Sequence, residues 1–563
     1  MKLVLQIFFA FLSDLEPLSC QQAGLRYIFF HCEGTKSLSV ILLFIILLCP
    51  QTSFSDWQDT TEVSSYKIRV KNFSNLEIAE LGNKKIYADE FLNSYEFGPA
   101  FAKREKDSKK RFLDFMIYEK LLAIEGYQKG LDTSEDVQLF LNDIINDLAS
   151  EQMYRETIWN KIVVDSTTFS KAVEKELIEL KISWIFKPTQ NEIANQFNLL
   201  KNGMSFDSLF YKQFNDSVTY DDRHLETTRF KLEKTNSALA AILDSIKIGK
   251  PSQPIKTPDG WYIVRIDNLW KNVIITETQN NELKYSVEEY LRKQKADSVS
   301  DAFVNKLLFD NQATIVRTSF NKLKAFIGKK YLSPDKFNEW NLLKNINDAE
   351  FNPVNMEGSL NEVLVKTKST DYTLKNFIDW YSNREPYIKF DFKSHQSLYA
   401  SLQNIVWRMV RDELLGKIAR EKGYDKNPEI EKQKLWWQDK IIYSKMKLEL
   451  ANTINIPDAR VKEYYNQNLK KYSGENGKIK PFDEIKKDVW NDCYVFEFTK
   501  KMVNKVLSLK EKYKIKINDS ALNSLTVLDE NNPHTIEVYS IKKGGTIVRP
   551  VYPSIDYEWQ FWN

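Results

Sequence analysis

The chain has 563 residues, of which 42% are hydrophobic and 28% are charged, a composition typical of a folded protein of roughly three or four domains. Lysine and arginine number 80 against 77 acidic residues, and the formal net charge of +3 gives no single-sign field that would attract DNA or RNA. Nucleic acid is therefore not expected as a partner.

The N-terminus carries two apolar runs. The second reads SVILLFIILLCP, and Ser53 and Ser55 follow it where small residues precede a signal peptidase cut, here at Asp56. A run of ~12 residues makes a helix of roughly 18 Å, shorter than a ~30 Å hydrocarbon core. We expect a signal peptide at 36–55 and no stable membrane span. Residues 1–35 are interpreted as a misassigned extension; the alternative is that both apolar segments are real and tether the protein.

Cysteine usage agrees with export. Cys20, Cys32 and Cys49 precede the expected cut, and Cys493 alone follows it. A single thiol makes neither an internal disulfide nor a zinc site. The chain also has no phosphate-binding loop, no His-Glu-x-x-His, no Gly-x-Ser-x-Gly and no Cys-x-x-Cys motif. We therefore expect no cofactor and no bound metal.

Two segments of the chain align with each other at a constant spacing. FLDFMIYEKLLAIEGYQKG begins at Phe112 and IVWRMVRDELLGKIAREKG at Ile405, so that Gly423 follows Gly130 by 293 residues. Apolar residues recur at helical spacing in both, and a Lys-Gly pair ends each helix. A short hairpin precedes each copy, and in the second copy the Thr373 hydroxyl can cap the next helix. The sequence predicts two helical units with the same order of elements, which could equally be no more than a larger scaffold.

One helical unit carries an inserted segment of alternating strands and helices, and the other does not. The expected fold class is α+β multidomain, with duplicated, mainly helical units and one inserted α/β domain. The expected bounds are 56–180 for helical unit 1, 181–270 for the inserted domain, 271–317 for a return helix completing unit 1, 318–472 for helical unit 2, 473–517 for a closing helix and 518–563 for an aromatic C-terminal tail.

The inserted segment opens with the strand ISWIF from Ile182, places Gly203, Phe206 and Asp207 after a helix, and closes with GKPSQPIKTPDGWYIVRI from Gly249. It resembles the parvulin family of peptidyl-prolyl isomerases, whose landmarks are a Gly-x-x-Ser-x-Pro-Ile-x-Thr segment and a Gly-aromatic-His closing strand. The helical units are similar to those of exported chaperones built on the SurA and PrsA plan. The resemblance implies a periplasmic folding factor that binds unfolded or extended client polypeptides, including outer-membrane proteins.

The chain departs from the family at the site residues. The first-strand histidine aligns with Trp184, the closing-strand histidine with Tyr262, the pocket cysteine or aspartate with Ser217, and the Gly-Asp-Leu-Gly turn with residues 223–226. Rotation about an X-Pro bond faces a barrier of roughly 18–20 kcal/mol and needs no nucleophile, so the loss of the histidines alone does not exclude activity. Loss of both histidines and of the glycine turn predicts weak or absent catalysis. His224 is interpreted as a solvated loop residue; the alternative makes it a replacement polar group in the pocket.

These patterns predict a folding chaperone whose helical cradle and degenerate inserted domain hold extended peptides. The side chains expected to line the groove of the inserted domain are Trp184, Phe206, Phe230, Ile246 and Tyr262. Two alternatives remain, an active prolyl isomerase and a non-catalytic assembly protein of the envelope. The tail IVRPVYPSIDYEWQFWN is interpreted as packing on its own domain or serving a specific partner; a pseudo-client held in the cradle is the other possibility.

Overall fold

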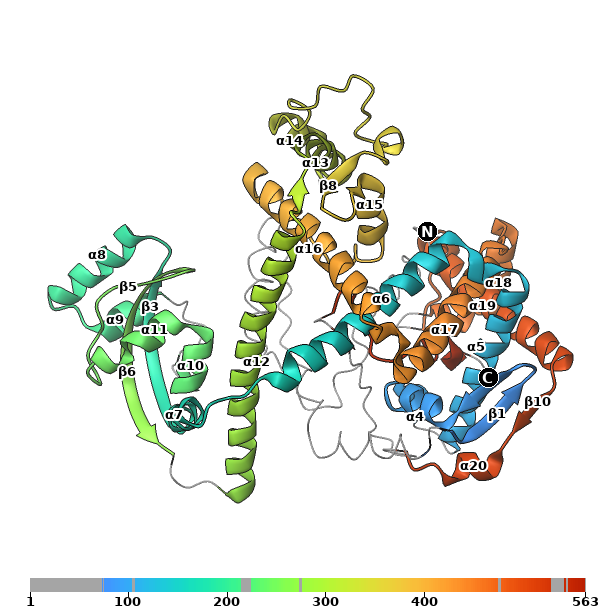
Figure 1. Ribbon diagram of the computed structural model, residues 1–563, viewed down its shortest axis with the longest axis horizontal. Coiled ribbons are helices and arrows are strands. Elements are labelled where there is room, and N and C mark those ends of the chain that lie inside the picture. The colour runs from blue at the N-terminus through green and yellow to red at the C-terminus, as the bar shows by residue number, and fades with distance from the viewer. Residues whose placement is uncertain are drawn as a thin grey trace. The chain divides into compact units, whose positions relative to one another are not determined.

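The computed structural model describes residues 73, 75–103, 107–213, 224–272, 276–473, 477–527, 541–542 and 545–561 (Figure 1). They form helices and small antiparallel sheets, the α+β multidomain fold that the sequence predicts. The contacts divide the chain into two units, residues 1–151 with 314–563, and residues 152–313. We call them the helical unit and the inserted unit.

Several predictions at the N-terminus lie outside the described residues, namely the extension at 1–35, the signal peptide at 36–55 and the three cysteines before Asp56. Cys493 is buried and is not part of a disulfide within the described residues. In the described ranges, no helix is both long enough and apolar enough to cross a membrane.

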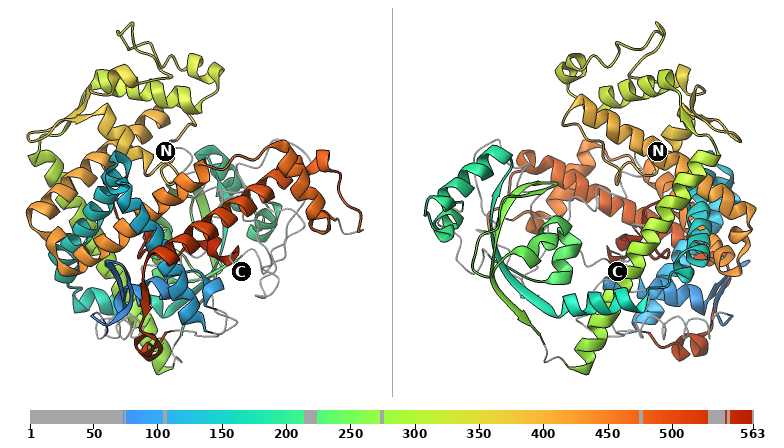
Figure 2. Two further views of the ribbon diagram at one scale, coloured as in Figure 1. Left: turned by 90° about the vertical axis from the view of Figure 1, so that its right-hand side faces the viewer. Right: turned by 60° about the vertical axis from the view of Figure 1, so that its left-hand side comes forward.

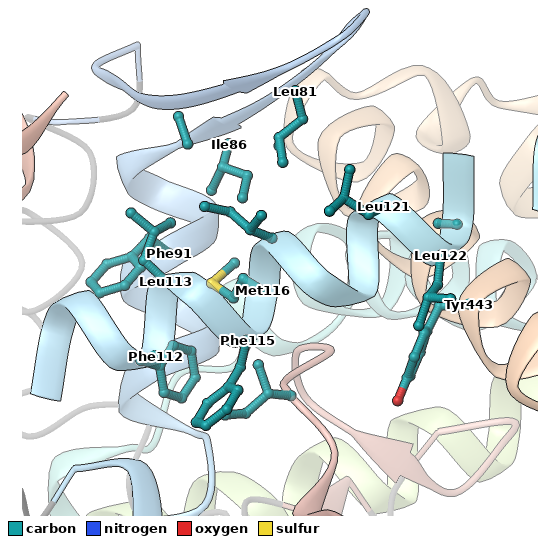
Figure 3. Packing of buried hydrophobic residues seen from close by; sticks show 14 of the residues in the cluster. Leu81, Ile86, Phe91, Phe112, Leu113, Phe115, Met116, Leu121, Leu122 and Tyr443 are labelled. Carbon is teal, nitrogen blue, oxygen red and sulfur yellow. The ribbon is translucent and has the colours of Figure 1, made fainter. Parts of the chain in front are cut away.

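The first part of the helical unit is a hairpin followed by helices. Its hairpin turns at Gly82, whose φ of 59° is left-handed. The elements are β1 (Glu77–Leu81), β2 (Lys84–Tyr87), α4 (Ala88–Glu96), α5 (Ser108–Gln128) and α6 (Glu135–Thr157), the last of which runs on into the inserted unit. The rings of Phe91 and Phe112 meet edge to face at 5.9 Å in the core below the hairpin (Figure 3).

The second part of the helical unit also contains a hairpin followed directly by helices, together with elements that the first part lacks. Thr373 caps the helix that follows this hairpin, as predicted, because its hydroxyl accepts from the backbone N–H of Asn376. The elements are β7 (Thr314–Ile315), α13 (Arg317–Tyr331), α14 (Pro334–Glu339), β8 (Val363–Lys366), β9 (Tyr372–Thr373), α15 (Leu374–Ser382), α16 (His395–Glu421), α17 (Pro428–Asn452), α18 (Asp458–Gln467), α19 (Phe482–Lys512), β10 (Ile515–Ile517), α20 (Asp519–Ser524), β11 (Ile541–Lys542) and β12 (Arg549–Pro550).

The aligned glycines adopt the same backbone conformation. Gly130, after α5, has φ 71°, and Gly423, after α16, has φ 78°. This left-handed conformation, which glycine adopts without a steric penalty, ends each helix as the Lys-Gly pairs predict. A short 3-10 turn follows each glycine, at Leu131–Thr133 and at Tyr424–Lys426, before α6 and α17 begin.

Segments that are far apart in the sequence pair and pack with each other in the helical unit. β10 pairs antiparallel with β1, and β7 pairs antiparallel with β8, so each hairpin gains a strand from elsewhere in the chain. α5 packs along α17, where a Cβ on Gly126 would come within 2.5 Å of Ile442 Cγ2. Residues 78–148 and residues 430–559 therefore contribute to one hydrophobic core (Figure 3).

The inserted unit is built on one antiparallel sheet of order β4-β3-β6-β5 (Figure 2). The predicted strands ISWIF and GWYIVRI lie in β3 and β6, which pair along their length. One face packs on α10 and α11, and the other on α8 and α9. The bounds are α7 (Ser166–Glu176), β3 (Ile178–Lys187), α8 (Gln190–Lys201), α9 (Phe206–Lys212), β4 (Leu225–Thr228), α10 (Arg229–Thr235), α11 (Ser237–Ile242), β5 (Ile255–Thr257), β6 (Gly260–Lys271) and α12 (Glu277–Asp310).

Candidate functional site

Trp184 and Tyr262 lie on the same face of the sheet in the inserted unit. In β3, alternation places Leu180, Ile182 and Trp184 on this face, and Tyr262 comes to it from the adjacent strand β6. Both rings are partly buried, and both pack against the same apolar cluster. Trp184 and Tyr262, which the resemblance to parvulins would place where those isomerases have histidines, therefore present aromatic surface on one face.

The Tyr262 hydroxyl is held by a carboxylate. It donates to Asp259 Oδ2 over 2.5 Å, and Asp259 also accepts from the Thr257 hydroxyl. Burial, together with the hydrogen bond to Asp259, raises the pKa of Tyr262 well above its ordinary value. The phenol therefore stays protonated near neutral pH and offers no general base.

The structure divides the other predicted groove residues between three places. Ile246 packs on the same cluster as Trp184 and Tyr262. Phe206 lies on the opposite face of the sheet, with the Arg265 guanidinium 4.5 Å above its ring. Phe230 packs against α7 and α12, with its ring 5.3 Å from that of Tyr290. One face thus holds three of the five residues, and a single groove lined by all five is not formed.

The side chain of His224 is buried, so the interpretation of this loop residue as solvated is wrong. Its side chain is 2% exposed, its ring stacks on Phe210 at 6.0 Å, and its Nδ1 lies 2.9 Å from Ser183 Oγ. Ser183 in turn donates to Asp267. Because Ser183 neighbours Trp184 on β3, this polar group lies on the opposite face of the sheet and does not replace the family's histidines.

A sequence signal for the burial of His224 does exist. Ser183 stands among apolar residues of a strand at a position that alternation directs inward, and a buried hydroxyl needs a polar partner. Asp267 occupies a comparable position in β6. Ser217, which aligns with the pocket cysteine or aspartate, lies outside the described residues.

The aromatic tail is seated in the core of the helical unit. The Trp559 ring stacks on Phe115 at 6.0 Å and lies 6.4 Å from the Tyr443 ring. Its indole Nε1 donates to Glu119 Oε1 over 2.9 Å, and the backbone N–H of Asp556 donates to the same oxygen over 2.7 Å. α5 and α17 therefore bind this stretch of chain through both aromatic stacking and main-chain hydrogen bonding.

Buried charges around Asp556 balance one another. Its carboxylate accepts from Lys440 at 2.7 Å, from the Tyr443 hydroxyl at 2.9 Å and from Lys447. Burial alone would raise the pKa of Asp556, but Lys440 and Lys447 together hold it below its ordinary value. Burial also raises the pKa of Glu119 to about 7. Lys440 and Lys447 of α17 are thus both paired with Asp556 of the tail.

A second attachment holds the tail further upstream. The Arg549 guanidinium pairs with Asp147 of α6 at 2.9 Å, and the backbone N–H of Thr546 donates to the same carboxylate over 2.7 Å. Arg384, after α15, donates to the Thr546 carbonyl over 2.9 Å. The tail therefore bridges both parts of the helical unit. Among the residues described, no group of three or more acidic, histidine or cysteine side chains is placed to hold a metal ion.

No family model and no curated protein matches the chain. Several solved structures do. The peptidylprolyl isomerase PrsA from Bacillus anthracis matches at 17% identity with a TM-score of 0.18, over 33% of this chain and 94% of that one. A structure from work on PEB4 and Cj1289, two SurA-like chaperones of Campylobacter jejuni, matches at 18% identity with a TM-score of 0.18. The match covers 40% of this chain and 94% of that one. PrsA from Bacillus subtilis matches at 16% identity and a TM-score of 0.16, over 40% and 93%. Sequence identities and TM-scores this low do not establish an activity for this chain.

Proposed function

We propose that the protein is an exported chaperone of the parvulin, SurA and PrsA type, which binds unfolded or extended polypeptides in the periplasm and has weak or no prolyl isomerase activity. The observation that carries this proposal is the placement of Trp184 and Tyr262 against one apolar cluster on the same face of the sheet in the inserted unit. These are the positions where the resembling isomerases have their histidines.

An isomerase has to bind the twisted amide more tightly than the planar one, which takes a proline pocket with polar groups aimed at the rotating carbonyl. Trp184 and Ile246 offer apolar surface, and the Tyr262 hydroxyl is already engaged by Asp259. Such a face favours contact with apolar side chains of a client over stabilisation of a transition state. Trp184, Ile246 and Tyr262 are therefore the client-binding residues proposed in this unit.

The segment that aligns with the family's glycine turn supports the same proposal. Leu225 begins β4 and pairs with Ile182 of β3. The preceding residue, His224, is hydrogen-bonded to Ser183 and stacks on Phe210. A strand with paired backbone groups has little of the freedom that a glycine turn provides. We expect this difference to reduce catalysis independently of the histidine replacements.

Two assays on the same preparation test the proposal. The first follows cis-to-trans rotation of an X-Pro bond in a peptide, with a histidine-bearing parvulin as the positive control. The second follows light scattering while an unfolded client aggregates. The expected result is no acceleration of rotation together with suppression of aggregation. Acceleration that disappears in Trp184→Ala or Tyr262→Ala would instead establish an active isomerase.

A matched variant tests the aromatic face. Trp261 adjoins Tyr262 in β6 but packs with the opposite face of the sheet. Tyr262→Ala is expected to weaken client binding several-fold, while Trp261→Ala leaves it within about twofold of the unchanged protein in samples that remain folded. Equal effects of the two substitutions would count against a binding role for the Trp184 and Tyr262 face.

A further inference from the structure

Two lysines of α13 are buried, and their surroundings differ. Lys322 is 7% exposed and is paired with Asp348 and Glu362. Lys324 is 6% exposed, and its Nζ forms no hydrogen bond or ion pair with any residue in the described part of the chain. Lysine is almost never fully buried without a partner, because an isolated ammonium loses its hydration there. The surroundings of Lys324 therefore call for an anion that the described chain does not supply.

The side chains around Lys324 come from two facing helices. On α13, Phe320 and Lys324 are four residues apart, so they share one side of the helix. On α16, His395 and Tyr399 have the same spacing. The rings of Phe320 and Tyr399 meet at 5.2 Å, and Lys324 Nζ lies 5.9 Å from the centroid of the Tyr399 ring. The ring of Trp340, at the end of α14, lies 6.2 Å from that of His395. These contacts bring α13, α14 and the start of α16 together (Figure 1).

His395 also has an unused polar atom. Its Nε2 is buried and has no hydrogen-bond partner among the described residues. Burial lowers the pKa of His395, and the positive charge of Lys324 lowers it further. Burial likewise lowers the pKa of Lys324, and the charge of Arg317 adds to this effect. The charged groups that act on the ammonium and on the imidazole are thus basic themselves.

The N-terminus of α16 adds to the positive potential. His395 is the first of the 27 residues of this helix. The backbone N–H groups of a first helical turn carry partial positive charge, and acidic side chains are favoured beside them. The first turn of α16 contains no acidic residue. A buried lysine, a buried imidazole and a helix N-terminus therefore meet at one place, and each of these groups favours an oxyanion.

We infer that Lys324, His395 and the N-terminus of α16 form a binding site for an oxyanion, which is a phosphate, sulfate or carboxylate group. The ligand lies between the ammonium and the imidazole, beside the rings of Trp340 and Tyr399. Tyr399 is 43% exposed, so the site opens at the surface of α16. The site belongs to the helical unit and does not depend on the proposed chaperone function.

Thermal unfolding in increasing inorganic phosphate, at an ionic strength held constant with sodium chloride, tests the site. A ligand that binds only the folded state stabilises it, so phosphate is expected to raise the midpoint by about 2 °C or more. Lys324→Met keeps an unbranched side chain but removes the ammonium, and the phosphate response should disappear. The same substitution should raise the midpoint in phosphate-free buffer by about 2–4 °C, because it removes an unpaired buried charge.

Lys322→Met is the matched control, because Lys322 lies on the same helix and is buried to nearly the same extent, but it is paired. This variant should have a lower midpoint than the unchanged protein and keep the phosphate response. Lys329→Met removes an exposed lysine of α13 and should keep both. His395→Gln is a milder change in the site, and it should weaken phosphate affinity several-fold even if Lys324→Met does not fold.

Two short peptides of one sequence distinguish a dissolved ion from the end of a polypeptide. One peptide ends in a free carboxylate and the other in an amide. Stabilisation by phosphate alone would identify a dissolved ion as the ligand, and stabilisation by the carboxylate peptide but not by the amide would identify a chain end. Either result supports the site if the Lys324 or His395 variant reduces it. No stabilisation by any of these probes, or equal stabilisation of the unchanged protein and the site variants, overturns the inference.

Discussion

Trp559 and Glu119 are 440 residues apart in the sequence, and the indole Nε1 of Trp559 donates a 2.9 Å hydrogen bond to the buried carboxylate of Glu119. The same carboxylate oxygen accepts from the backbone of Asp556. α5 thus depends on the last described turn of the chain to satisfy a buried acidic group. A seated tail of this kind is part of the fold of the helical unit.

Substitution of Trp559 should destabilise the protein. Trp559→Ala removes a buried ring and one donor to Glu119, and it should lower the free energy of unfolding of the helical unit by about 3–5 kcal/mol. Trp559→Phe keeps an aromatic ring but loses the donor, with an expected cost of about 1–3 kcal/mol. Denaturant unfolding followed by circular dichroism measures both. Tyr557→Ala is the control, because that side chain is 42% exposed; an equal loss in Tyr557→Ala would contradict the structural role of the tail tryptophan.

Asp439 should be the most sensitive acidic residue at the contact of α5 with α17. Its carboxylate accepts from Lys84, Lys120 and Tyr127, each at 2.8 Å, and Lys120 also pairs with Glu90. Asp439→Asn leaves a buried lysine short of an anion and should cost about 3–5 kcal/mol. Glu449→Gln removes the exposed pair with Lys129 between the same two helices and should cost less than about 1 kcal/mol.

The contribution of Asp439 to the free energy of unfolding should decrease as the pH falls. Burial would raise the pKa of Asp439, but Lys120 and Lys84 bring it below its ordinary value. A carboxyl with a lowered pKa stabilises the folded state above its unfolded pKa, and this contribution is lost as the pH falls through the folded value. Acidification should therefore remove the stabilisation that the ionised Asp439 provides. The expected observation is a difference in free energy of unfolding between the unchanged protein and Asp439→Asn that narrows as the pH falls.

The sequence predicts many local elements of this structure, but it does not predict which distant segments pair with each other. The strand containing GWYIVRI, the helix-ending glycines Gly130 and Gly423, and the Thr373 cap depend on neighbouring residues, and each is found. The partnership of β1 with β10 joins residues more than 430 positions apart, and nothing in either strand specifies the other. The candidate site divides in the same way, because alternation groups Trp184 with Tyr262, whereas Phe206 and Phe230 are placed by helices whose packing depends on the whole unit.

Asp412 should make the protein less stable as the pH rises. It is buried, its Oδ1 accepts from Arg411, and its Oδ2 has no hydrogen-bond partner within the described part of the chain. Burial raises the pKa of Asp412 to about 6, against the lowering effect of Arg411 and Arg384. A carboxyl with a raised pKa costs nothing below its unfolded pKa of about 4, and the penalty grows to about 3 kcal/mol as the pH rises past 6.

Asp412→Asn removes this penalty. Relative to the unchanged protein, its free energy of unfolding should be higher at about pH 8 and nearly equal at about pH 4. Burial also raises the pKa of Glu413 to about 7, and the charge of Asp412 contributes to that rise, so the difference at about pH 8 includes relief of the repulsion between these two carboxyl groups. Denaturant midpoints measured across this pH range check the prediction, and a constant difference between the two proteins would contradict it.

Introducing histidines at positions 184 and 262 should not create an efficient isomerase. In the double variant Trp184→His and Tyr262→His, both imidazoles would stand on the face that now carries the aromatic rings. The pocket would still lack the family's glycine turn, because Leu225–Thr228 is paired to β3 and His224 remains under the opposite face against Phe210. We therefore expect X-Pro rotation in the peptide assay to stay close to the uncatalysed rate, while client affinity falls because apolar ring surface has been lost. Rotation approaching that of the histidine-bearing control would mean that the two aromatic replacements alone had silenced the site.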